Sequence, residues 1–208
     1  MSLRHALLGL LTAQPMTGYD LAKVFDRSVE FVWHAPHSQI YPELRRMEAD
    51  GLIAAESLFR GRRPKRVYAI TADGRRELEQ WVAEPSVPER VRDPQRLKTT
   101  YLEFASYDDA RRHFRVHLEH YEIWRRRWAS HVEQLADRAT PLLRRRLAAE
   151  GIGDPEAIVA YKVHAYRGMV RQAELEVEWA REGLRLVDEL EAEARKPSPV
   201  PGAERSSG

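Results

Sequence analysis

The sequence predicts a mainly α-helical protein that carries one small β-hairpin. Three observations support this fold class. Apolar residues recur at the helical spacing of three or four positions over most of the 208-residue chain. Two short segments, Ile53–Phe59 and Val67–Ile70, alternate instead and contain β-branched or aromatic residues, which is typical of paired strands. The second half of the chain has no strand signal, so it predicts helices only.

Composition narrows the classes of function. Hydrophobic residues make up 43% of the chain and charged residues 32%, which favours long solvated helices over a compact enzyme with a deep pocket. The formal net charge is only +2, so any affinity for nucleic acid must come from local patches. There is no cysteine, which excludes disulfides, thiolate catalysis and cysteine-ligated zinc. No apolar run is long enough to span a membrane, and the short run Ala6–Leu11 is not typical of a signal peptide. We therefore expect a cytoplasmic protein.

Capping residues and helix breakers define the first two helices. A helix over Leu3–Thr12 ends before Pro15. A second helix begins after Thr17, which starts a T-x-x-D capping pattern, and runs to about Asp26. Residues 28–36 are apolar but irregular. They either extend the second helix or form the turn before the next one.

A third helix is predicted over residues 37–50. Ile40, Leu44 and Met47 recur at i, i+4 and i+7 and face a core, and Gly51 is a natural C-terminal cap. Glutamine and arginine side chains make bidentate contacts with base edges, and serine and tyrosine bond phosphates. The polar face of this helix carries these residue types at Ser38, Gln39, Tyr41 and Arg45. The alternative interpretation is an ordinary solvated amphipathic helix.

The loop between the two predicted strands is strongly basic. Its candidate phosphate contacts are Arg60, Arg62, Arg63 and Lys65. These charges repel one another in the free protein, and a phosphate backbone would relieve that repulsion and release counterions. A polar helix followed by a hairpin with a basic loop is the organisation of a winged helix-turn-helix that reads DNA. Tyr19, in the first turn of the second helix, either bonds a phosphate or packs on the wing.

The remainder of the chain predicts an all-α domain. A fourth helix begins after Thr71, its expected N-cap, and prolines at positions 85 and 88 end it and begin a linker. Further helices are predicted over Pro94–Ala105, from Ser106 to Ala139, in a short segment from Pro141, and over Pro155–Ala194. Such long helices usually pack on a partner, so we expect a homodimer through them. The predicted division is a DNA-binding domain at 1–84, a linker at 85–93, a helical dimerisation domain at 94–195 and a disordered tail at 196–208.

Two clusters allow more than one interpretation. His113, His117 and His120 have spacings that could bind a metal, but surface histidines on a charged helix are the favoured interpretation. Trp124, Trp128 and Tyr166 could line a pocket for an aromatic ligand, although aromatic residues at helical spacing more often belong to a core or a dimer interface. The sequence contains no catalytic motif, so we expect neither an enzyme nor a cofactor.

The segment Ser38–Ile53 resembles the recognition-helix signature of PadR-type transcriptional regulators. Three further segments match the same family in order and spacing: Leu7–Leu11, Thr17–Leu21 and Tyr68–Gly74. The resemblance is specific over residues 1 to about 84 and weaker in the C-terminal half. That half is similar to the helical dimerisation domain of the longer subfamily, which includes the quorum-regulated virulence activators of vibrios.

The resemblance implies a sequence-specific DNA-binding transcriptional regulator that acts as a repressor and whose homodimer binds a pseudo-palindromic operator in double-stranded DNA. It also implies a small aromatic or planar effector, because some relatives bind such molecules. The alternative function is a winged-helix scaffold for protein–protein assembly that has no specific affinity for DNA.

Overall fold

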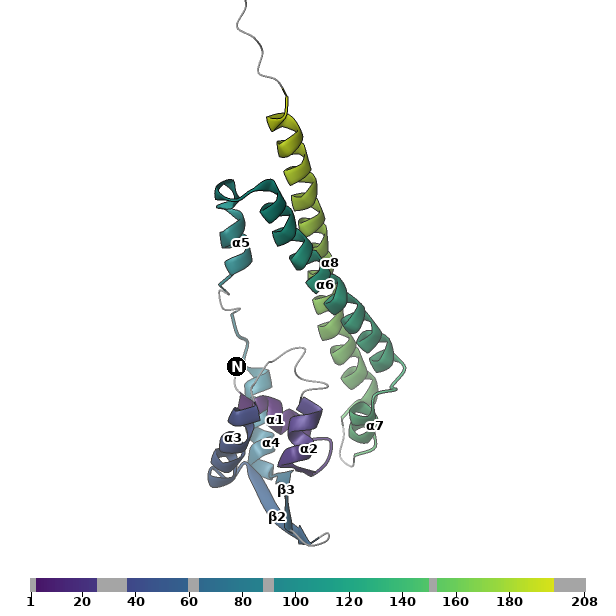
Figure 1. Cartoon of the computed structure of the whole chain (residues 1–208). Coiled ribbons are helices and arrows are strands. Elements are labelled where there is room, and N and C mark those ends of the chain that lie inside the picture. Colours follow the sequence, from purple (N-terminus) through teal and green to yellow (C-terminus); the bar gives the residue numbers. More distant parts are fainter. Residues whose placement is uncertain (1–2, 26–36, 60–63, 88–91, 150–152, 197–208) are drawn as a thin grey trace, which may run out of the picture. The chain divides into compact units, whose positions relative to one another are not determined.

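The computed structural model describes residues 3–25, 37–59, 64–87, 92–149 and 153–196 (Figure 1). Its contacts divide the chain into two compact units. The first draws on residues 1–89 and 130–165, and the second on residues 90–129 and 166–208. No described helix is long and apolar enough to cross a membrane.

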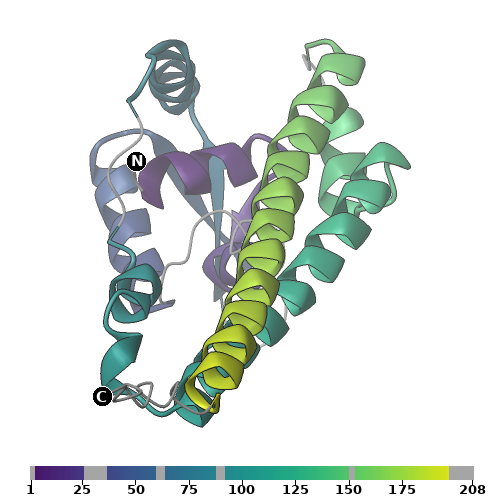
Figure 2. The same ribbon diagram turned by 90° about the horizontal axis from the view of Figure 1, so that it is seen from above.

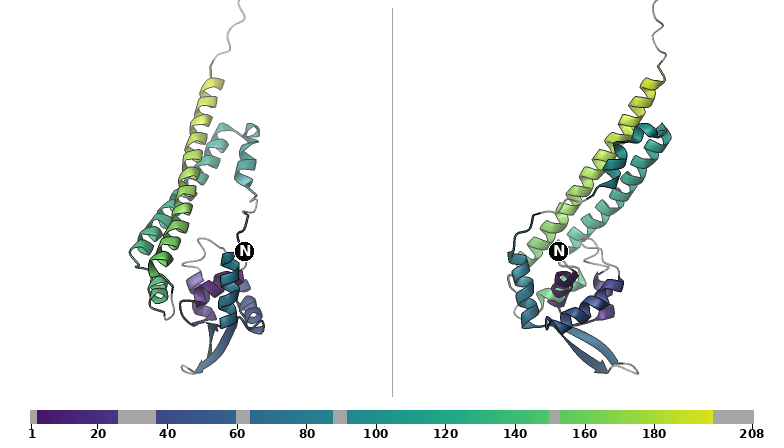
Figure 3. Two further views of the ribbon diagram at one scale, coloured as in Figure 1. Left: turned by 180° about the vertical axis from the view of Figure 1, so that it is seen from behind. Right: turned by 90° about the vertical axis from the view of Figure 1, so that its left-hand side faces the viewer.

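The first unit contains a winged helix. Its helices are α1 (Leu3–Leu11), α2 (Gly18–Val24), α3 (His37–Ala49) and α4 (Ala72–Ala83). Its strands are β1 (Met16–Thr17), β2 (Ile53–Phe59) and β3 (Pro64–Ile70), which form an antiparallel sheet in the order β1-β3-β2. Ile53 pairs with Ile70 at one end of the hairpin and Phe59 with Pro64 at the other. The hairpin β2–β3 projects from the helices of its unit (Figure 3).

Local hydrogen bonds explain the helix boundaries. The Thr17 hydroxyl accepts a hydrogen bond from the Asp20 amide at 3.1 Å, and the Thr71 hydroxyl accepts one from the Gly74 amide at 3.1 Å. Both predicted N-caps are therefore confirmed. Gly51 has a φ of +74° after the last turn of α3, which confirms the predicted C-terminal cap because glycine adopts this conformation without a steric penalty.

The core of the first unit lies between α1, α2, α3 and the base of the sheet. Leu7, Leu8, Leu21, Ile40 and Leu44 are fully buried there. Leu142 from α7 (Pro141–Leu147), a helix far along the chain, packs against the same core. The winged helix and α7 therefore share one apolar core, which the sequence did not indicate.

The second unit is built on two antiparallel helices. α6 (Tyr107–Ala136) and α8 (Pro155–Ala194) lie side by side (Figures 1 and 2), and the second unit contains α6 up to residue 129 and α8 from residue 166 onward. Phe114 of α6 packs where Gly183 of α8 leaves space, because a Cβ added at Gly183 would lie 2.3 Å from the Phe114 ring. The short helix α5 (Pro94–Thr99) and the 3₁₀ turn η2 (Leu102–Phe104) precede α6.

Some element boundaries differ from the sequence predictions. The structure contains β1, which was not predicted because two residues carry no periodic signal. β3 begins at Pro64 instead of Val67, so Lys65 lies in a strand and not in the loop. The helix predicted over Pro94–Ala105 is split into α5 and η2. The segment 28–36 and the tail from residue 197 onward lie outside the described residues.

Candidate nucleic-acid interface

Helix α3 has one buried face and one polar face. Ile40, Leu44 and Met47 have no exposed surface, which confirms the predicted core face. Ser38 and Gln39 in the first turn, and Arg45 further along, are exposed. Because the apolar face fixes the rotation of the helix about its axis, these polar side chains are held at the surface of the unit.

The start of α2 lies against α3. A Cβ added at Gly18 would lie only 2.8 Å from Cε1 of Tyr41, so the Tyr41 ring packs closely over the first residue of α2. Tyr41 is nevertheless 47% exposed, and the adjacent Tyr19 is 67% exposed. The two tyrosines therefore stand at the solvent side of the α2–α3 contact, each with a hydroxyl that suits a phosphate oxygen.

Arg4 of α1 fixes the position of α3, and it was missed by the sequence analysis. Its Nε donates a hydrogen bond to Glu43 at 3.2 Å, and its Nη2 donates one to Asp50 at 2.6 Å. Glu43 lies within α3 and Asp50 directly follows its last residue, so a single guanidinium links the middle of the helix to its C-terminal end. The partners are 39 and 46 positions away in the sequence, and no local pattern indicates such a pairing.

The hairpin contributes further basic groups. Lys65 is exposed on β3. Arg66, the next residue, donates a hydrogen bond to Glu48 of α3, and this bond raises the pKa of Arg66. The other predicted contacts of the loop, Arg60, Arg62 and Arg63, lie outside the described residues.

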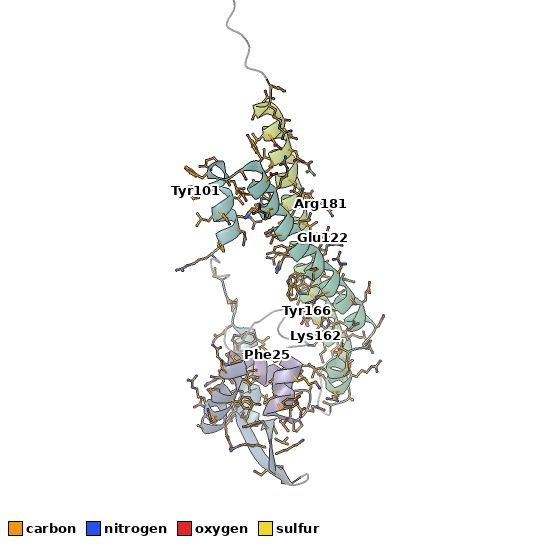
Figure 4. The ribbon with its side chains drawn as sticks, in the orientation of Figure 1. Phe25, Tyr101, Glu122, Lys162, Tyr166 and Arg181 are labelled. Atoms are coloured by element: carbon orange, nitrogen blue, oxygen red, sulfur yellow. The ribbon has the colours of Figure 1, made fainter. Side chains whose placement is uncertain are left out.

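The predicted aromatic ligand residues lie in the second unit. The rings of Trp124 and Trp128 are 5.5 Å apart and inclined by 32°. The indole Nε1 of Trp128 is shielded from solvent and has no hydrogen-bond partner among the described residues. Tyr166 lies on α8 (Figure 4). Its side chain is buried, and burial raises the pKa of its hydroxyl to about 12.

The histidine cluster differs from the prediction of surface histidines. His117 is buried, and its Nε2 lies 3.0 Å from the Glu176 carboxylate. His113 lies 3.1 Å from the Thr99 hydroxyl, and its pKa is lowered by burial. His120 alone is exposed, as predicted. Among the residues that the structure describes, no group of three histidine or carboxylate side chains could hold a metal.

Comparison with known proteins gives a consistent result. Residues 7–80 match the transcriptional regulator PadR-like family. The probable transcriptional regulator Rv1176c of Mycobacterium tuberculosis is 47% identical over 91 residues, which are 43% of this chain and 48% of that protein. The negative transcriptional regulator PadR of Bacillus subtilis is 34% identical over 119 residues, which are 56% of this chain and 65% of that protein. The matched segments thus span from about half to just under two thirds of these relatives.

Solved structures extend the likeness of the fold over most of the chain. Bacillus subtilis PadR in complex with operator DNA has a TM-score of 0.69 at 24% identity, and the match covers 89% of this chain and 98% of that one. The same protein in complex with p-coumaric acid has a TM-score of 0.66 at 26% identity, covering 89% and 95%. The Vibrio cholerae virulence activator AphA has a TM-score of 0.65 at 25% identity, covering 91% and 99%.

Proposed function

We propose that this chain, whose residues 7–80 form a domain of the PadR-like family of transcriptional regulators, binds a specific operator in duplex DNA. The observation that carries the proposal is the geometry of α3. Its apolar side is fully buried, so Ser38, Gln39 and Arg45 are presented together at the surface. Such a helix enters the major groove and reads base edges, while Tyr19 and Tyr41 bond the adjacent phosphates.

In this proposal the hairpin supplies contacts to the DNA phosphates, which do not depend on the base sequence of the DNA. Lys65 is exposed on β3, and the basic residues Arg60, Arg62 and Arg63 precede it. In this proposal the hairpin lies along the flanking phosphates or in the minor groove. The domain division predicted from the sequence belongs to the same proposal, with DNA bound by residues 1–84 and a second copy bound by residues 94–195.

We further propose a homodimer, because a pseudo-palindromic operator requires two copies of α3 about one helical turn of DNA apart. Large apolar side chains of the second unit support this. Phe104 is 86% exposed and Leu97 61%, and Leu190 near the end of α8 is 52% exposed. Exposed apolar residues in this number are typical of an oligomer interface. Sedimentation of the purified protein tests the proposal, and a monomer at micromolar concentration would contradict it.

The direction of regulation and the effector are proposals as well. The Bacillus subtilis relative is named a negative regulator, which supports repression by occupation of a promoter. A structure of that protein contains p-coumaric acid, which supports an effector for this chain. Trp124, Trp128 and Tyr166 are the aromatic side chains proposed to contact it. A regulator of this kind acts on chromosomal DNA, in the cytoplasm, and needs no catalytic group.

The decisive experiment measures binding of the full chain to its own upstream DNA and to a scrambled duplex at two salt concentrations. We expect tight, salt-sensitive binding that prefers the native fragment. Equal and weak binding to both duplexes, with and without candidate effectors, would overturn the proposal. It would favour a winged helix that assembles with other proteins.

A further inference from the structure

The proposed recognition helix α3 is acidic for a segment that approaches DNA. Residues 37–50 carry more carboxylates than arginines, with Glu43, Glu48 and Asp50 against Arg45 and Arg46. Each DNA phosphate carries a negative charge, so uncovered carboxylates on this segment would oppose the approach of any duplex. Tight binding of DNA therefore requires that other residues neutralise these carboxylates.

All three carboxylates are paired, and two of the paired cations come from outside the helix. Arg4 of α1 donates a hydrogen bond from Nε to Glu43 at 3.2 Å and another from Nη2 to Asp50 at 2.6 Å. Arg66 of β3 donates a hydrogen bond to Glu48. The net charge around α3 thus depends on residues of α1 and β3 as well as on the helix itself.

The contact between Arg4 and Glu43 is only partly solvated. The side chain of Arg4 is 27% exposed and that of Glu43 is 14% exposed, whereas Arg46, the other partner of Glu43, is 71% exposed. Burial alone would lower the pKa of Arg4, but the hydrogen bonds and charges of Glu43 and Asp50 raise it, so the guanidinium stays charged. Water and salt screen a partly buried pair less than an exposed one. Arg4 therefore neutralises Glu43 more effectively than Arg46 does.

We infer that Arg4 sets the DNA affinity of α3 without touching the DNA. It is a positioning residue that acts through Glu43 and Asp50, because it cancels their charges and holds both carboxylates toward α1. Its Nε and Nη2 form the edge that would bind a phosphate through two parallel hydrogen bonds, and both atoms are occupied by these carboxylates. The inference rests on the proposed function, in which α3 is the helix that enters the major groove.

The dimensions of a helix make such an effect measurable. An α-helix with its side chains is about 10–12 Å across. The Debye length is about 8 Å at physiological salt and longer in dilute salt. A carboxylate uncovered on the α1 side of α3 therefore acts on phosphates near the exposed side, and it acts more strongly as the salt concentration falls. Because this carboxylate contacts no base, it should affect duplexes of every sequence alike.

Binding of the full chain to its own upstream DNA and to a scrambled duplex, at about 50 mM and about 300 mM salt, tests the inference. For Arg4→Met we expect the affinity for both duplexes to fall about 3–10-fold at the lower salt and less than about twofold at the higher salt. The ratio between the two duplexes should stay unchanged, whereas a displaced α3 would lower it. Arg138→Met is the matched control, because it removes the same charge and uncovers Glu156 of α8, and it should keep the wild-type affinity.

Further variants separate the charge of Arg4 from its hydrogen-bond geometry. Arg4→Lys keeps the charge but loses the planar guanidinium, and its affinity should stay within about twofold of the wild-type value. Arg4→Met combined with Glu43→Gln and Asp50→Asn should regain at least the wild-type affinity. If Arg4→Met fails to fold, Glu43→Gln with Asp50→Asn replaces it in a chain that retains Arg4, and this variant should bind both duplexes more tightly.

Three results would overturn the inference: wild-type affinity of Arg4→Met at the lower salt, a loss of equal size at both salts, or a combined variant that stays weak. The absence of tighter binding in the replacement variant would do the same. These results leave the proposed function intact as long as the wild type prefers its upstream DNA. A wild type that binds both duplexes equally and weakly would instead overturn the proposed function, and the inference with it.

Discussion

Arg66 of β3 donates a hydrogen bond to the carboxylate of Glu48 on α3, and its guanidinium lies 5.9 Å from the centre of the Tyr68 ring. The pair joins the proposed recognition helix to strand β3 of the hairpin, at the residue that pairs with Ser57. Both side chains are partly or largely exposed, so the pair contributes little to the stability of the fold. Its effect is positional, because it directs one basic group of the hairpin toward α3 instead of toward a ligand.

Removal of the carboxylate should release Arg66 for a phosphate. For Glu48→Gln we expect stronger binding to all duplexes and a salt dependence that is steeper by about one charge. Binding isotherms at several salt concentrations measure this. Glu79→Gln makes the same charge change at an exposed position of α4 and should leave the slope unchanged. Equal slopes for the two variants would show that Arg66 stays away from the DNA backbone.

Gln39 is exposed in the first turn of α3, where a glutamine reaches base edges. Gln39→Ala should relax the preference for the native operator by about 1–3 kcal/mol at one base pair, because a bidentate contact is lost. Competition binding with single-base variants of the operator measures this. Lys65→Ala should instead weaken binding to DNA duplexes of every sequence by a similar factor. If the Gln39→Ala variant keeps the wild-type preference for the native operator, Gln39 does not read a base.

Gly74 lies in the first turn of α4 against the backbone of Leu52. A Cβ at this position would lie 2.1 Å from the Leu52 carbonyl oxygen, which accepts the Thr71 amide. Gly74→Ala should therefore lower the free energy of unfolding by about 1–3 kcal/mol or more. Urea denaturation measures the change. Gly9→Ala is the matched control in α1, where an added Cβ meets no atom within 4 Å, and it should stabilise the protein by about 0.5–1 kcal/mol.

Glu176 is a buried carboxylate in the second unit that joins two polar side chains, Arg96 and His117. Its carboxylate accepts hydrogen bonds from Arg96 at 3.1 Å and lies 3.0 Å from Nε2 of His117. Glu176→Ala removes the carboxylate beside the buried His117 and leaves Arg96 with Asp93 as its ion-pair partner, so it should destabilise the protein by about 1–3 kcal/mol. Glu178→Ala removes an exposed carboxylate on the same helix, and its free energy of unfolding should stay within about 0.5 kcal/mol of the wild-type value. Similar urea midpoints for the two variants would contradict this role of Glu176.

Stability should fall in mild acid because two histidines are held neutral in the folded state. Burial lowers the pKa of His113, and burial together with Lys162 lowers the pKa of His131, from the ordinary 6.5. Below pH 6.5 the unfolded chain binds more protons than the folded chain, so the free energy of unfolding falls as the pH drops through the folded pKa values. Tm at pH 7.5 and pH 5.5 measures this.

Substitution identifies the histidine that is responsible. His131→Gln should reduce the loss of Tm between pH 7.5 and pH 5.5, because it removes one group that must take up a proton. His164→Gln, at an exposed position of α8, should leave the loss unchanged. If both variants lose as much Tm as the wild type, His131 has no part in the acid sensitivity.

The winged helix was predictable from the sequence because its signals are local. Ile40, Leu44 and Met47 follow the helical period, and the caps at Thr17 and Thr71 act on amides three residues away. The hairpin was predicted for the same reason, since alternation and turn residues act between neighbours. The exposed positions of Ser38 and Gln39 then follow from the buried face of their helix.

Tertiary structure decided how the charged and polar groups are paired. Arg4 binds α3 across 39 and 46 positions, His117 is buried against Glu176 across 59, and Arg146 reaches Thr12 across 134. A sequence pattern reports only what shares a helical turn or a strand, whereas these contacts depend on which helices pack together. For this reason the sequence does not distinguish Arg66 and Arg146 from the other arginines. Only the packed structure shows that Arg66 pairs with a carboxylate, whereas Arg146 has no carboxylate partner among the described residues.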